Sequence, residues 1–176
     1  MRYFPVFFSV SLCLCGSSAL ASQAARASEP RDLEFTAACD GTAQRYVALL
    51  PEGYDAARAC DLLIALHGHG SDRWQCIKDE RDECRAVRDI AAEHGMILVS
   101  PDYRARTSWM GPKAEADLLQ IIGDLKKAHS VGKVFLFGGS MGGSAALTFA
   151  GLHPDLIAGV ASMNGTANHL EYENFQ

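Results

Sequence analysis

The sequence predicts a single α/β domain with a mostly parallel sheet and helices on both of its faces. Apolar runs that do not alternate with polar residues, such as 61–66 and 133–137, are typical of strands buried on both sides. Segments with apolar residues at helical spacing separate these runs, as the crossovers between parallel strands require. A length of 176 residues with 48% apolar content allows one hydrophobic core.

The first 21 residues are predicted to be a secretory signal peptide, ahead of a domain spanning residues 22–176. Arg2 supplies a positive charge, residues 4–14 are apolar, and Ala19–Ala21 fits a cleavage site with small residues. A membrane anchor is the alternative, but the apolar run is about half the roughly 20 residues that a spanning helix needs. We therefore expect an exported protein, periplasmic or extracellular, without a stable membrane anchor.

Each element of the domain has its own local signal. Residues 33–41 and 43–55 predict two antiparallel strands joined by a turn at Asp40-Gly41. Strands and helices then alternate: strands are expected within 61–70, 96–103, 133–137 and 156–164, and helices within 82–95, 111–132 and 141–153.

Helical spacing and end signals support the three helices. Val87, Ile90 and Ala91 share one face of the first helix, which Gly95 ends. The second helix has Pro112 near its start, basic residues in its last turn and an apolar stripe at Leu118, Ile122 and Leu125. Pro154 ends the third helix.

The charge of the chain argues against a nucleic-acid partner. The net charge is -5, and no Lys/Arg cluster is interleaved with aromatic residues, so we expect no nucleic-acid partner.

Four cysteines follow the leader, and three disulfide pairings are open. The sequence weakly favours Cys39 with Cys60. Cys76 and Cys84 can pair only if the chain bends between them, because an unbroken helix would hold them about 12 Å apart. No metal-ligand spacing occurs.

A G-x-S-x-G motif at residues 138–142 carries the most specific chemistry. It follows a predicted strand and precedes a predicted helix, which is the context of a nucleophile elbow. Gly138 and Gly142 leave room for close backbone approach, and Ser140 is held out where it can attack. Phosphate-binding readings fail, because Ser144 replaces the Walker lysine and Arg73 replaces the third glycine of a dinucleotide fingerprint. Glycines that serve only helix–sheet packing remain an alternative.

With "LHGHG" at 66–70, "VSPDYR" at 99–104 and "GGSMGG" at 138–143, the chain resembles the α/β-hydrolase family over about Arg45 to Met163. The resemblance is closest to secreted carboxylesterases and to the catalytic domains of prolyl-oligopeptidase-type enzymes. It implies Ser140 as the nucleophile, backbone N–H groups of Met141 and His69 as the oxyanion hole, and no metal or other cofactor.

The same resemblance bears on the loop after the strand at 96–103. Asp102 and Arg104 match a family feature that steadies this loop, and we expect an internal ion pair between them. Arg106 and Trp109 are candidates for the substrate rim, although a surface cation beside a packed indole is an equal alternative.

The acid and histidine of a catalytic triad are not found in their family positions. Only 36 residues follow Ser140, with His153 and His169 among them, and the family's last two strands have no counterpart. We expect an exported serine hydrolase that cleaves small-molecule or polymer-attached carboxylic esters, represented by an incomplete chain that is inactive alone. A serine peptidase and a non-catalytic module that binds an acyl or sugar ligand are the alternatives.

The leader yields a prediction about processing. Expressed from its own start codon in a bacterial host, the protein should be recovered outside the cytoplasm with an N-terminus at or near Ser22, because small residues precede the predicted cut. Intact-mass measurement of the exported protein checks the site. Exported protein that retains Met1 would contradict cleavage.

Overall fold

The computed structural model describes residues 28–168, so the predicted signal peptide and His169 lie outside the described residues. The strands are β1 Arg31–Thr36, β2 Ala43–Leu49, β3 Cys60–Leu66, β4 Ile97–Pro101, β5 Val131–Gly139 and β6 Gly159–Met163. The helices are α1 Gln75–Lys78, α2 Asp82–Glu93, α3 Pro112–Ala128 and α4 Met141–Leu152. All elements expected from the sequence within this range are present, and only the short α1 was not predicted.

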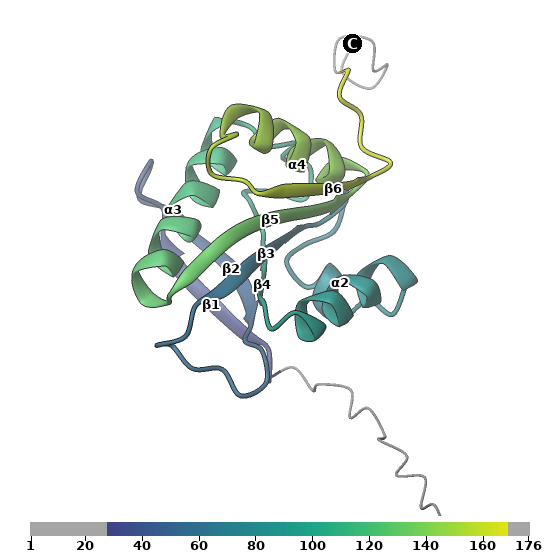
Figure 1. Cartoon of the computed structure of the whole chain (residues 1–176). Coiled ribbons are helices and arrows are strands. Elements are labelled where there is room, and N and C mark those ends of the chain that lie inside the picture. Colours follow the sequence, from purple (N-terminus) through teal and green to yellow (C-terminus); the bar gives the residue numbers. More distant parts are fainter. Residues whose placement is uncertain (1–27, 169–176) are drawn as a thin grey trace, which may run out of the picture.

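The six strands form one mixed sheet in the order β1-β2-β4-β3-β5-β6 (Figure 1). β2 is antiparallel to both of its neighbours, whereas β4, β3, β5 and β6 run parallel to one another. Gly41 closes the first hairpin with a φ of 73°, a conformation that a side chain disfavours. The predicted class, a mostly parallel sheet with a short antiparallel entry, is confirmed.

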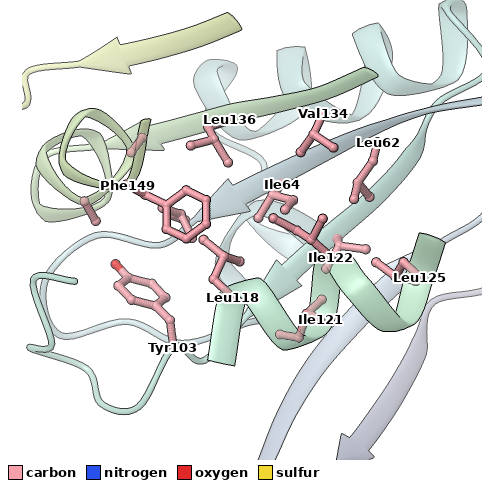
Figure 2. Close-up of a cluster of buried hydrophobic side chains, with 14 of the residues drawn as sticks. Leu62, Ile64, Tyr103, Leu118, Ile121, Ile122, Leu125, Val134, Leu136 and Phe149 are labelled. Carbon is pink, nitrogen blue, oxygen red and sulfur yellow. The ribbon is translucent and has the colours of Figure 1, made fainter. Parts of the chain in front are cut away.

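Alternate residues of the central strands feed two separate core layers. Leu62 and Ile64 of β3 pack with α3 and α4, while Leu63 and Ala65 pack with α1 and α2 on the opposite face. Figure 1 shows α2 on one side of the sheet and α3 with α4 on the other. Figure 2 shows the α3 stripe, which includes Leu118, against the side chains of β3 and β5. Burial on both faces explains why these strands read as continuous apolar runs.

One face of α2 differs from the expectation. Val87 and Ala91 are buried, but Ile90 is 46% exposed. Ile90 borders a surface groove of about 730 Å³ whose floor includes Phe135 and Val160. The helical spacing correctly placed Ile90 on the same face of α2 as Val87 and Ala91. Its side chain nevertheless lies at the edge of the buried part of that face.

The expected ion pair between Asp102 and Arg104 is wrong, because each residue has a different partner. Asp102 Oδ2 lies 2.9 Å from Arg73 Nη1, which connects the loop after β4 to the loop after β3. Arg104 reaches Asp117 on α3, with Nη2 2.7 Å from Oδ1. Burial raises the pKa of Asp117, and Arg104 opposes this rise. Local sequence suggested a local pair, but the charges join separate segments.

The weakly favoured pairing of Cys39 with Cys60 is also wrong. Cys39 accepts a hydrogen bond from Arg104 Nη2 at 2.9 Å, beyond the carboxyl end of β4. Cys60 is the first residue of β3, which runs parallel to β4, so it lies at the opposite edge of the sheet. The two thiols are therefore about a strand length, roughly 20 Å, apart, far beyond disulfide reach.

Close backbone contact fixes where α4 leaves the sheet. A Cβ on Gly142 would lie 2.7 Å from the carbonyl oxygen of His67 and would collide with that of Leu66. A Cβ on Gly138 would collide with the carbonyl of Gly142. Both neighbours are backbone atoms of the sheet or of α4, which cannot rotate away as a side chain can.

This contact predicts a sharp difference between two glycines of one helix. Gly142→Ala should lower the free energy of unfolding by about 3 kcal/mol or more, because the methyl group forces β3 and α4 apart. Gly151→Ala is the matched control: no atom lies within 4 Å of its added Cβ, and alanine favours the helix by about 1 kcal/mol. Urea unfolding followed by circular dichroism measures both variants. Equal stability of the two would rule out the close-contact explanation.

Candidate active site

Ser140 occupies the junction of β5 and α4 in a strained backbone conformation. Its φ is 55° and its ψ is -120°, a region that non-glycine residues rarely adopt. Two hydrogen bonds hold this geometry: the Ser140 N–H donates to the Met163 carbonyl at 2.8 Å, and the Ser140 carbonyl accepts from the Ser144 N–H at 3.0 Å. The side chain is exposed, so its hydroxyl lies open to a ligand.

A cavity of about 400 Å³ lies beside Ser140. Residues of β3, α1, α2, β5 and β6 and of the loops between them enclose it. Its lining residues are Leu66, Gly68, His69, Gln75, Cys76, Arg81, Glu83, Cys84, Phe137, Gly139, Ser140, Met163 and Asn164. The cavity therefore opens at the carboxyl ends of β3, β5 and β6, where parallel sheets bind their ligands.

The loop after β3 is anchored on both sides of His69. Gly68 N–H donates to Gln75 Oε1 at 2.7 Å, and Gly70 N–H donates to the Arg106 carbonyl at 2.8 Å. Tyr103 donates its hydroxyl proton to the His67 carbonyl at 2.6 Å. Burial raises the pKa of Tyr103, so the phenol keeps this proton. His69 thus lies on a short, fixed stretch of backbone at the cavity.

The backbone N–H groups of His69, which lines the cavity, and of Met141, which directly follows Ser140, have no hydrogen-bond partner among residues 28–168. Met141 is the first residue of α4, where N–H groups lack intrahelical acceptors and the helix dipole is positive. Two such donors near a serine hydroxyl can stabilise negative charge on an oxygen bound between them.

The two histidines of the loop after β3 differ in their surroundings. His67 is 1% exposed, and its ring nitrogens lie 2.9 Å from the Gly68 carbonyl and 3.2 Å from the Asp102 carbonyl. These contacts join the β3 and β4 loops, and they leave the ring facing two acceptors rather than a substrate. His69 is exposed, and its ring centroid lies 6.4 Å from that of Trp109.

No histidine ring within residues 28–168 hydrogen-bonds to Ser140. His153 Nε2 lies 2.8 Å from Glu115 Oε1 of α3, and His129 contacts Tyr54 through Nδ1. His94 follows the last residue of α2.

The described residues contain no cluster of three or more side chains that could hold a metal ion. None of the helices among these residues is long and apolar enough to cross a bilayer.

The two rim candidates, Arg106 and Trp109, contact different parts of the protein. Arg106 is 69% exposed, lies 3.6 Å from Asp72, and lines a second cavity of about 390 Å³ on the far side of the loop after β3. Trp109 packs against the α3/α4 core layer and faces His69, with a φ of 50°. Neither residue is part of the lining of the cavity beside Ser140.

Gln75 and Asn164 belong to the site but were not found from the sequence. Gln75 acts through Gly68, seven residues earlier, and this contact depends on the unpredicted helix α1. Asn164 follows β6 with a φ of 53° and faces the cavity. The only available signal was that loops at the carboxyl ends of parallel strands carry binding residues.

Comparison with solved structures gives the same fold. Fluorophosphonate-binding serine hydrolase F (FphF) of Staphylococcus aureus aligns with a TM-score of 0.66 and 20% identity over 84% of this chain and 63% of its own. The ferulic acid esterase AmCE1/Fae1A of Anaeromyces mucronatus, solved with ferulic acid, aligns with a TM-score of 0.61 and 20% identity over 77% and 57% of the two chains. The chain therefore spans about three fifths of these proteins.

Sequence comparison identifies the family. No curated protein matches the chain. The family model described as the alpha/beta hydrolase fold matches residues 62–176, which is more than half of the chain. The strand order, the turn at Ser140 and this match agree, and the chain belongs to the α/β-hydrolase fold family.

Proposed function

We propose that this protein is a serine hydrolase that cleaves carboxylic esters with Ser140 as the nucleophile. The observation that carries the proposal is the position of Ser140: a strained residue at the start of α4, beside a cavity that His69 also lines, with the unpaired N–H of Met141 directly after it. Strain of this kind persists only where the surrounding structure enforces it, and it is concentrated at functional sites.

The proposed chemistry uses the geometry in two steps. Ser140 Oγ attacks the ester carbonyl, and the oxygen that gains charge is held by the N–H groups of Met141 and His69. Loss of the alcohol leaves an acyl group on Ser140, and water then releases the acid. No histidine among residues 28–168 hydrogen-bonds to Ser140, and we place the general base outside these residues.

The substrate class follows from the cavity and from the similar structures. The similar structures include proteins named as ferulic acid esterases and S-formylglutathione hydrolases. In this chain Arg81 and Glu83 contribute charged groups to the lining of the cavity. A polar wall favours an ester with hydrogen-bonding groups over a long alkyl ester, whether the alcohol is small or attached to a polymer. We also propose that the protein acts after export, as its leader predicts.

One observation favours a second candidate, a non-catalytic module of the same fold that binds an acyl or sugar ligand. Ser140 Oγ has no hydrogen-bond partner among the described residues, so no base activates it there. The two candidates differ in reactivity toward an electrophile and are separated by the next experiment.

A fluorophosphonate probe should label Ser140. The hydroxyl is exposed and two N–H groups can stabilise the phosphonyl oxygen, so an active preparation should react within minutes and Ser140→Ala should not react. Ser130→Ala, an exposed serine outside the cavity, is the control and should label like the wild type. Gel fluorescence and peptide mass spectrometry give the result. Labelling that survives in Ser140→Ala would exclude Ser140, and an unlabelled wild type would favour the binding module.

Gln75 should matter for turnover although it does not react. Gln75→Leu removes the acceptor of the Gly68 N–H and frees the loop that carries His69, so kcat/KM for a p-nitrophenyl ester should fall by about 10- to 100-fold, less than the 10²–10³ for deleting an oxyanion donor. Gln120→Leu is a matched control, since Gln120 also accepts a backbone N–H, at 2.8 Å from Ala38, but on α3. Equal losses in the two variants would show a general stability effect.

A further inference from the structure

Two cysteines lie together in the wall of the cavity beside Ser140. Cys76 of α1 and Cys84 of α2 are each 2% exposed and belong to the same core layer. The two side chains lie on helices that pack against each other, and they face the same core layer and the same cavity. Burial raises the pKa of Cys84, and the neighbouring Cys76 thiol opposes this rise. Both thiols are free in the structure, and both line the cavity.

The bend that this pairing requires lies between α1 and α2. Asp79 ends α1 with an extended ψ of 132°, and Arg81 precedes α2 with a ψ of 147°. Arg88 of α2 donates from Nη1 to the carbonyls of Cys76 and Asp79, at 2.9 and 2.8 Å. The guanidinium thereby holds the end of α1 against α2. The chain therefore bends between α1 and α2, as a Cys76–Cys84 pairing requires.

We propose that Cys76 and Cys84 form a disulfide bond that ties α1 to α2 and fixes the wall of the cavity. The other two cysteines of the described residues are unsuited to this pairing. Cys39 is bound by Arg104, and Cys60 lies at the far edge of the sheet. The inference is independent of the proposed function, because it concerns the redox state of two side chains and not the reaction at Ser140.

The oxidation needs a partner, which we take to be a small or protein-bound disulfide. The Cys84 thiol loses its proton and its sulfur attacks the oxidant, which breaks the oxidant's S–S bond and releases one thiol. The Cys76 sulfur then displaces the second thiol and loses its own proton. Two thiols are oxidised, one external disulfide is reduced to two thiols, and two electrons and two protons are transferred. Both cysteines line the cavity, which is the side from which the oxidant approaches.

Peptide mapping tests the bond directly. The purified full chain is incubated with oxidised glutathione at pH 8, blocked with an alkylating reagent and digested with trypsin, which cuts after Arg73, Lys78, Arg81 and Arg85. We expect one linked species, residues 74–78 joined to residues 82–85, that separates on reduction. Alkylation of both thiols, or linkage of either to Cys39 or Cys60, would overturn the proposal.

Thermal unfolding supplies a second measurement. Reduction should lower the Tm of the oxidised wild type by roughly 5 to 10 °C, the scale expected for opening a short cross-linked loop. Cys39→Ser should show the same redox-dependent shift, because Cys39 lies outside the pair. Cys84→Ser should show none. A redox-dependent Tm that persists in Cys84→Ser would also overturn the assignment, and neither measurement depends on hydrolytic activity.

Discussion

The contact between the first turn of α4 and the end of β3 determines the rest of the site. Without side chains at Gly142 and Gly138, the helix backbone meets the Leu66 and His67 carbonyls directly. This approach turns the chain at Ser140, places the Met141 N–H directly after it at the start of α4, and brings α4 against the end of β3 and the start of the loop that carries His69. Met163 at the end of β6 completes the turn by accepting the Ser140 N–H. A wider spacing would change all of these positions together.

Most of the fold could be predicted from local patterns, because each element depends on short-range preferences. Continuous apolar runs indicated the buried strands, and Gly95 and Pro112 marked helix ends that the structure confirms. α1 could not be predicted, since four residues contain about one helical turn and no periodicity. Ile90 had the right spacing for burial, but spacing does not say how far the covered area extends.

The site was less predictable, because its supporting contacts join residues distant in sequence. Arg73 pairs with Asp102 across 29 positions, and Arg104 pairs with Asp117 on another element. Their formation depends on the order of the strands, which brings the loops after β3 and β4 together. The motif at 138–142 pointed to Ser140, but no pattern indicated Gln75. The roles of Ser140, Met141 and His69 in catalysis stay predictions.

The division of the core into two layers has a consequence for the dynamics of the protein. α1 and α2 pack only on the layer that contains Leu63 and Ala65, whereas α3 and α4 share the larger layer with most of the sheet. Local opening follows such cooperative units. The α1–α2 unit can therefore detach while the β5–α4 turn stays folded, and its amide protons should exchange with solvent before those of α4. Opening of the α1–α2 unit would thus change ligand access to Ser140 without unfolding the backbone that holds Ser140.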